Sequence, residues 1–202
     1  MNRTVAVCAV VICAFFACIA KAEAKGALPA DAAVLLEMEG QSYYLGHNLH
    51  GDLARRKVYS ANYQLPGGLI PWGLEIQIIK IQRNYLSFKD VKTGLTWNYW
   101  FSGKTRRAVS LKEHLQRVFV RDIGLLRRQV AGLSKVDQDG IYEGRALQGM
   151  SRTGVLIANG YPPEFANSRD LMKLRDWYYW QSRFDKIKIS FNRQGEVVKI
   201  VD

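Results

Sequence analysis

Two histidines and an aspartate in the first third of the chain have the residue types and spacing of a metal site. His47 and His50 form an H-x-x-H pattern, and Asp52 lies two positions further on. A zinc ion needs at least three converging ligands, and the one other histidine, His114, belongs to a different predicted element. We therefore expect a polar loop here and no metal. A hydrolase that uses these residues is the less favoured alternative.

No other set of reactive side chains points to catalysis. Serine and threonine residues have no histidine and acid close by, and Gly67-Gly68 lacks the spacing of a phosphate-binding loop. Glu37, Glu39 and Glu75 do not form the carboxylate pair of a glycoside hydrolase. All the cysteines, Cys8, Cys13 and Cys18, lie in a segment that we expect to be removed. We therefore predict that the protein is not an enzyme and needs no cofactor.

Aromatic residues concentrate in a C-terminal run that is suited to binding another protein. Residues 177–180 read Trp-Tyr-Tyr-Trp, so a strand here carries aromatic side chains on both faces, and one pair must lie outside. Buried tryptophan and tyrosine anchors dominate many interfaces. The alternatives are that the first domain covers this face, or that the rings only shield lysine stems. The predicted partner-binding residues are Trp177, Tyr178, Tyr179, Trp180, Lys188 and Lys199.

The chain has 202 residues and a formal net charge of +11, and its arginines form a basic belt between the two predicted domains. Such a belt favours anionic partners, and its affinity falls as salt rises. An anionic lipid, lipopolysaccharide or an acidic protein fits an exported chain better than nucleic acid does. A solvated charged face without a ligand is the alternative. The predicted anion-binding residues are Arg106, Arg107, Arg117, Arg121, Arg127 and Arg128.

Short runs and tight turns predict a small β domain over residues 25–109. Runs that favour strands occur at 34–38, 41–45, 57–60, 74–81 and 96–101. Ile76 and Ile78 alternate with polar residues, and the phase reverses at Ile79. Trp97, Tyr99 and Phe101 of the last run share one face, which we expect to lie in the core. A strongly bent sheet or an SH3-like barrel is the predicted architecture.

Helix signals begin at Ser110, which forms a capping box with Glu113 and opens a helical connector over residues 110–133. A second module follows over residues 134–202. Ser134 caps a helix that we expect to extend to Gly149, with Leu147 on its buried side. A second helix is predicted from Ser151 to Gly160, and three strands complete the module.

The second module resembles the SmpA/OmlA (BamE) family through residues that stand in the family's order and spacing. These residues are Gly149-Met150-Ser151, Val155, Gly160-x-Pro162, the pair Trp177 and Tyr179, Phe191 and Gly195. The family fold is ααβββ, similar to the repeat unit of β-lactamase inhibitor proteins. The resemblance implies two helices on one face of three strands, with Ile187, Ile189, Phe191, Val198 and Ile200 toward the helices.

Gly154 and Asn159 depart from the family pattern, in which a better helix former and an apolar residue usually occupy these positions. That family includes a small lipoprotein of the outer-membrane β-barrel assembly machinery, and the first domain of this chain has no counterpart in that lipoprotein. We therefore transfer the fold, and we do not transfer membership in the outer-membrane assembly machinery.

Residues 1–24 have the features of a signal peptide. Arg3 supplies a positive charge, an apolar run extends to Ala20, and Ala22-Glu23-Ala24 forms a small-x-small cleavage site. We expect export, with a periplasmic or outer-membrane-associated location. A lipid anchor through Cys18 is not expected, because Phe15 is a poor first residue for a lipoprotein cleavage box.

Together these features predict an α+β protein without catalytic activity that works in the cell envelope through contact with another protein. Outer-membrane assembly or maintenance is the process that the resemblance implies. Binding of an anionic envelope lipid or polymer through the basic belt is the alternative function.

Overall fold

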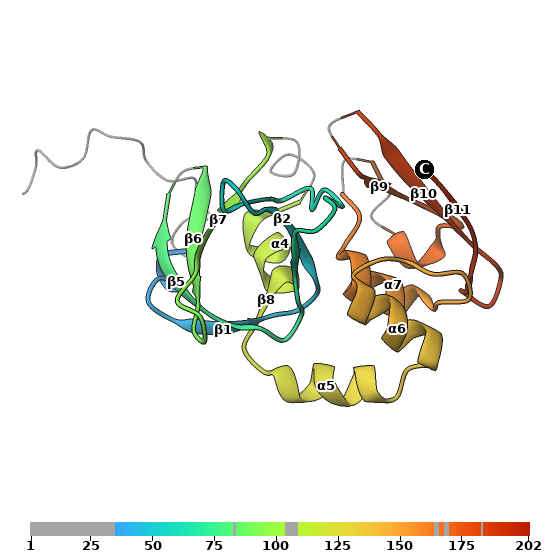
Figure 1. Cartoon of the computed structure of the whole chain (residues 1–202), viewed down its shortest axis with the longest axis horizontal. Coiled ribbons are helices and arrows are strands. Elements are labelled where there is room, and N and C mark those ends of the chain that lie inside the picture. The colour runs from blue at the N-terminus through green and yellow to red at the C-terminus, as the bar shows by residue number, and fades with distance from the viewer. Residues whose placement is uncertain (1–34, 83, 104–108, 164–165, 168–169, 183) are drawn as a thin grey trace, which may run out of the picture.

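The computed structural model describes residues 35–82, 84–103, 109–163, 166–167, 170–182 and 184–202. Within them the chain is a mixed α+β structure with a curled β-sheet, a second, smaller sheet and four helices (Figure 1). The predicted α+β class is therefore confirmed. The predicted signal peptide with Cys18, and the belt residues Arg106 and Arg107, lie outside the described residues. No helix in the described part is long and apolar enough to cross a membrane.

The N-terminal half, residues 35–120, is built on an eight-stranded sheet in the order β4-β2-β3-β7-β6-β5-β1-β8. All neighbours are antiparallel except β3 and β7. The strands are β1 (Ser42–Leu45), β2 (Leu49–Asp52), β3 (Lys57–Tyr59), β4 (Leu69–Ile70), β5 (Glu75–Ile81), β6 (Tyr85–Asp90), β7 (Thr96–Trp100) and β8 (Phe119–Val120).

Strand β5 follows the predicted alternation, including its reversal. Ile76 and Ile78 are fully buried, and the register against β6 shifts between Ile78 and Lys80. Such a bulge places one extra residue in the strand, so Ile79 is exposed and Ile81 returns to the core. Trp97 and Tyr99 of β7 and the adjacent Phe101 lie in the same core, as predicted, whereas Trp100 is half-buried on the other face.

Two stretches at the start of this half differ from the prediction. Of the run predicted at 34–38, the described residues 35–38 are not a strand: Leu35 and Leu36 are helical, and a turn follows to Gly40. Residues 49–52 form β2, although we predict a loop there. The sequence Leu-His-Gly-Asp has no alternation of its own, so β2 depends on its distant partners β3 and β4.

The predicted connector divides between the two halves. Helix α4 (Leu111–Val118) begins at Ser110, whose hydroxyl accepts from the Glu113 backbone N–H at 3.2 Å, as the capping box predicts. Its apolar side and Phe119 join the N-terminal core, and α4 lies within the curl of the sheet (Figure 1). Helix α5 (Ile123–Ala131) instead runs beneath both halves, and its Leu126 and Val130 pack on the C-terminal core.

The C-terminal half, residues 134–202, begins with two short helices. Ser134 caps α6 (Lys135–Glu143) and Ser151 caps α7 (Arg152–Asn159), as predicted. The prediction that the first helix continues to Gly149 is wrong, because Gly144 adopts a φ of 71° and ends α6 there. Leu147 therefore lies beyond the helix, although it packs on the same core.

An antiparallel sheet in the order β11-β10-β9 follows, with a short 3-10 helix, η1 (Leu171–Lys173), before it. The strands are β9 (Asp176–Trp180), β10 (Lys186–Phe191) and β11 (Val197–Val201). One face of this sheet shares a core with α6 and α7. The expectation that Val198 lies in that core is wrong: the register shifts between Ser190 and Phe191, so Val197 is buried and Val198 is 41% exposed.

Gly154 is required by the contact between the two helices. Asp137 of α6 is buried and accepts from the Ser151 backbone N–H at 2.7 Å and from the Ser134 hydroxyl at 2.8 Å, which links the two helix caps. A Cβ at Gly154 would lie 2.0 Å from the Asp137 carboxylate. The choice of glycine at position 154 therefore has a steric cause.

We predict that Gly154→Ala lowers the free energy of unfolding by about 1–3 kcal/mol, because the overlap outweighs the higher helix propensity of alanine. Gly132→Ala is the matched control, since the nearest atoms to a Cβ there lie at 3.6 Å and φ is −86°. Urea denaturation of both variants measures the difference. A Gly154→Ala protein as stable as the control would refute the steric account.

Candidate functional site

The candidate site is the face of the C-terminal sheet that points away from the helices, which we call the outer face. Its side chains alternate with the core residues along each strand, and the strand register places them in adjacent pairs. In Figure 1 the helices α6 and α7 lie between this sheet and the N-terminal sheet, so the outer face is the side of the C-terminal sheet remote from the N-terminal half. The outer face consists of Asp176, Tyr178, Trp180, Lys186, Lys188, Ser190, Lys199 and Val201.

Lysines and aromatic rings pair across β9 and β10. Lys186 stands opposite Trp180 with its Nζ 4.8 Å from the ring centroid. Lys188 stands opposite Tyr178 with its Nζ 6.0 Å from that ring. Tyr178 and Trp180 are half-buried and Lys186 is exposed. The stems and rings thus form a ridge in which each ammonium group attracts the adjacent ring.

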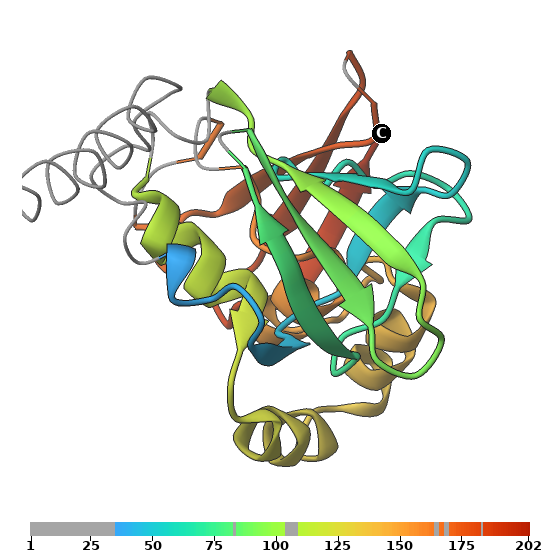
Figure 2. The same cartoon turned by 90° about the vertical axis from the view of Figure 1, so that its left-hand side faces the viewer.

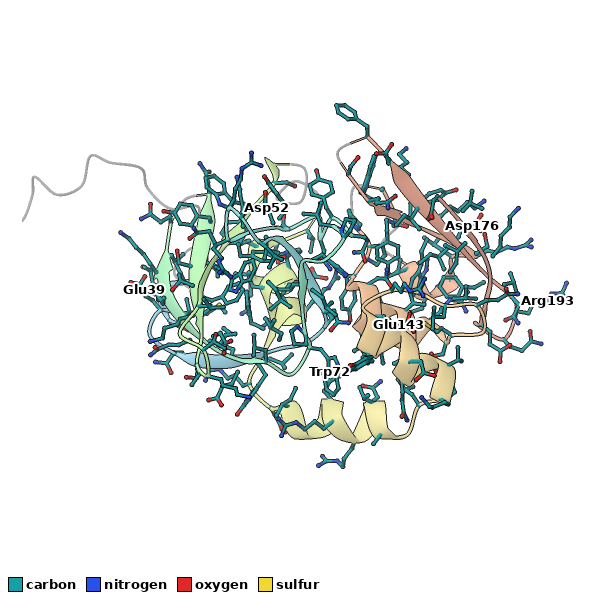
Figure 3. All side chains as sticks on the ribbon, viewed as in Figure 1. Glu39, Asp52, Trp72, Glu143, Asp176 and Arg193 are labelled. Atoms are coloured by element: carbon teal, nitrogen blue, oxygen red, sulfur yellow. The ribbon has the colours of Figure 1, made fainter. Side chains whose placement is uncertain are left out.

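One carboxylate belongs to this face. Lys188 Nζ lies 2.9 Å from the Asp176 carboxylate, which Figure 3 places on the side away from the N-terminal half. A hydrogen bond from the Ser190 hydroxyl and then the ammonium group of Lys188 lower the pKa of Asp176. Asp176 in turn raises the pKa of Lys188. Lys186 and Lys199 remain as exposed cations on the same face.

The other aromatic pair of β9 is not available to a partner. Trp177 and Tyr179 are fully buried, so of the two arrangements left open by the sequence the structure adopts the one with Tyr178 and Trp180 outside. Trp177 donates through Nε1 to the Leu171 carbonyl at 2.9 Å, and the Tyr179 hydroxyl donates to the Gly160 carbonyl at 2.9 Å. Burial raises the pKa of Tyr179 well above its usual value. These two side chains therefore belong to the core of the C-terminal half.

The described arginines of the predicted belt differ in their contacts. The Arg117 guanidinium pairs with Glu113 at 2.6 Å and lies 4.9 Å from the Tyr161 ring centroid. Arg121 lies over Tyr43, with its guanidinium carbon 5.4 Å from that ring centroid. The remaining two, Arg127 and Arg128, are exposed on α5.

His47 and His50 lie at the junction of the two halves. Both are buried: His47 Nδ1 donates to the Asn48 carbonyl at 2.8 Å, and His50 Nε2 donates to the Gly144 carbonyl at 2.9 Å. Asp52 pairs with Arg55 at 3.2 Å instead of joining them. The described residues contain no group of three or more histidine, cysteine, aspartate or glutamate side chains placed to hold a metal.

A set of amides, which we call the junction amides, joins the two halves next to these histidines. The carboxamide of Asn48 donates to the carbonyls of Ile141 at 2.8 Å and Ala158 at 3.1 Å, at the ends of α6 and α7. The junction amides are Asn48, Asn62, Gln64 and Asn159. Trp72 lies beside them, where Figure 3 shows it between the halves, and donates its backbone N–H to the Asn48 side chain at 2.8 Å.

Sequence reasoning does not identify this junction. The one signal in the sequence is Asn159, an amide at a position where the resemblance leads us to expect an apolar residue. In the structure its side chain donates to Gln64 at 2.8 Å, and its carbonyl accepts from Asn62 at 2.8 Å. Gly160 follows for a steric reason, since a Cβ there would lie 2.7 Å from the side chains of Asn62 and His47.

No protein-family model, curated protein or solved structure matches this chain.

We predict that acid weakens the junction through His47. Burial lowers the pKa of His47 from 6.5 to about 4, so the unfolded chain binds this proton at a higher pH than the folded one does. Stability from this group is complete above pH 6.5 and is lost as the pH falls toward 4. Between pH 7 and pH 5 the loss is about 2 kcal/mol, since one pKa unit corresponds to about 1.4 kcal/mol.

Urea denaturation at both pH values measures this loss. His47→Gln keeps an amide donor but does not titrate, so its loss between the two pH values should be smaller by that amount. Equal losses for the two proteins would show that His47 does not carry the effect.

Proposed function

We propose that this protein is a non-catalytic, exported cell-envelope protein that binds another protein through the outer face of its C-terminal sheet. The observation that carries the proposal is the ridge of Tyr178 and Trp180 with Lys186 and Lys188. Half-buried aromatic residues gain much of their contact energy when a partner completes their burial. Because Trp177 and Tyr179 fix β9 from below, the ridge is already ordered before a partner binds.

The charge of the outer face favours an acidic partner surface. It carries three lysines, Lys186, Lys188 and Lys199, and the single aspartate Asp176 is already paired with Lys188. An acidic side chain of a partner gains attraction from Lys186 and Lys199 without displacing an ion pair of the protein itself.

We also propose that residues 134–202 are an ααβββ module of the SmpA/OmlA kind. Two observations support this: α6 and α7 precede the three strands, and the buried residues of both helices share one core with Trp177 and Phe191. An SH3-like barrel is our proposal for the N-terminal half and is supported only by the curl of its sheet. This resemblance favours a role in outer-membrane assembly or maintenance. We propose that the protein is located in the periplasm or is associated with the outer membrane.

We predict that the double substitution Tyr178→Ser with Trp180→Ser lowers the recovery of the partner at least about tenfold, as the loss of two interface anchors commonly does. The measurement is a crosslinking pull-down from intact cells with quantification of the captured proteins. Tyr142→Ser is the matched control, because Tyr142 is an aromatic residue 86% exposed on α6. Unchanged recovery with the folded double variant would exclude the outer face as the binding surface.

A second candidate function is the binding of an anionic envelope lipid, lipopolysaccharide or polymer through α5. Arg127 and Arg128 are exposed on α5, and Arg128 lies one helical turn from Leu125, which is 65% exposed. An exposed apolar side chain near cations is a common feature of helices that rest on anionic membrane surfaces.

For this candidate we predict that the protein co-sediments with phosphatidylglycerol vesicles and is released by added salt. Arg127→Gln with Arg128→Gln should weaken binding about thirtyfold, since each cation near such a surface contributes about 1 kcal/mol. Arg55→Gln with Arg56→Gln is the control pair on the N-terminal half. Binding that is independent of salt, or equal in both double variants, would rule out α5 as the lipid site.

A further inference from the structure

The two edges of the C-terminal sheet differ. The edge at β9 is closed by side-chain and main-chain groups: Asn167 accepts from the Tyr178 backbone N–H at 3.0 Å and donates to the Tyr178 carbonyl at 3.1 Å. Further along, the Gln64 backbone N–H donates to the Trp180 carbonyl at 2.8 Å. A further strand cannot pair there without displacing these bonds.

The edge at β11 is closed only at its first residue. Val197 donates to the Met150 carbonyl at 2.8 Å and accepts from the Gly149 N–H at 2.8 Å. Beyond Val197, no strand pairs with this edge in the part of the chain that the structure describes. The strand there is apolar and accessible, with Val198 41%, Ile200 36% and Val201 42% exposed. Open, apolar strand edges are sites at which another chain pairs.

The register identifies the main-chain groups that are free at this edge. Tyr178 directs its N–H and C=O to Asn167, away from β10. Its neighbours in β9, Trp177 and Tyr179, therefore form the main-chain bonds to their partners Ile189 and Ile187 in β10. Lys188 and Ser190 of β10 therefore bond in the opposite direction, to their partners Val201 and Lys199 in β11. The N–H and C=O of Ile200 are left pointing outward from the sheet.

A cleft adjoins this edge. It has a volume of about 520 Å³. Its apolar lining includes Leu65 and Leu69 from the N-terminal half and Ala146, Ile187 and Ile200 from the C-terminal half. Its polar lining includes Glu143, Arg145 and Asp202. Figure 2 shows the C-terminus on the side of the molecule where the loops of the N-terminal sheet approach it. Binding sites in proteins commonly have volumes of about 300–1,000 Å³ and combine apolar walls with a few polar groups.

Strand β11 presents an apolar side chain on one side and a positive charge on the other. Ile200 lies opposite Ile189 on the side of the cleft, whereas Lys199 lies opposite Ser190 on the outer face. A strand added to this edge would place successive side chains alternately beside the apolar residues Leu65, Leu69 and Ile200 of the cleft and beside the Lys199 ammonium group. Alternating apolar and acidic residues complement both sides.

We propose that β11 and the cleft form a binding site for an extended segment of a partner protein, in which apolar residues alternate with acidic ones. The segment adds to the sheet as a fourth strand, bonds to the free N–H and C=O of Ile200, and inserts an apolar side chain between Leu65, Leu69 and Ile200. This site is distinct from the outer-face ridge of Tyr178 and Trp180, and it does not depend on that ridge.

The test uses a capped, fluorescent hexapeptide of alternating valine and glutamate as probe. We expect saturable binding, and we expect the amide hydrogen of Ile200 to exchange at least about tenfold more slowly in the complex while that of Lys199 changes little. A peptide with lysine in place of glutamate should bind several-fold more weakly, because like charges then oppose Lys199. Unprotected exchange at Ile200 with bound peptide would overturn the proposal.

Ile200→Pro is the sharpest variant, because it removes the outward N–H without removing a bond to β10. We expect it to weaken peptide binding at least about tenfold, while Ile200→Val, which keeps the N–H and most of the side chain, binds within about twofold of the original. Two peptides, N-methylated at the two alternate sets of residues, provide the same test without altering the protein. The peptide whose N-methyl groups point toward β11 should not bind, and the peptide whose N-methyl groups point away should bind normally.

Equal binding of both N-methylated peptides would refute strand addition. The Tyr178→Ser, Trp180→Ser protein should bind the peptide normally, so this site and the outer face succeed or fail separately.

Discussion

The arrangement of the whole molecule depends on how the last carbonyls of α6 and α7 are satisfied. The end of a helix leaves its final C=O groups without partners inside the helix, and burying them unpaired costs about 1–3 kcal/mol each. Here the N-terminal half supplies the donors. Asn48 donates through its backbone N–H to the Ile157 carbonyl at 2.9 Å and through its side chain to the next carbonyl, and Asn62 donates to that of Asn159. His50 serves α6 in the same way at Gly144. The two halves therefore cannot separate without exposing both helix ends.

This junction determines which surfaces remain for partners. With α6 and α7 held against the N-terminal half, the C-terminal sheet has its aromatic core face covered, and Tyr178 and Trp180 remain on the face that points away. The junction also brings Leu65 and Leu69 near Ile200 without filling the space between them, which creates the cleft. Both proposed sites thus follow from one set of buried amides.

Local signals in the sequence predicted the elements better than their association. Ser110, Ser134 and Ser151 each begin a helix as expected, because an N-cap acts within its own turn. The phase reversal in β5 was also visible, since a bulge shifts the pattern of burial. The strands β2 and β8 were not, because each is stabilised by residues far away in the chain. Alternation likewise could not decide between Trp177 and Trp180, since both faces of β9 are aromatic and only the position of the helices distinguishes them.

The distribution of positive charge shows why net charge alone is a poor guide to binding here. The chain carries +11, yet Arg117 and Arg121 lie on the rings of Tyr161 and Tyr43, and Arg152 lies 4.7 Å from the Phe191 ring centroid. A planar guanidinium stacks well on an aromatic face, so these arginines contribute to packing as much as to the surface field. The lysines of the outer face instead keep their ammonium groups at the surface, beside rings that are themselves half-exposed. A partner that meets this ridge gains apolar contact and charge attraction at the same place.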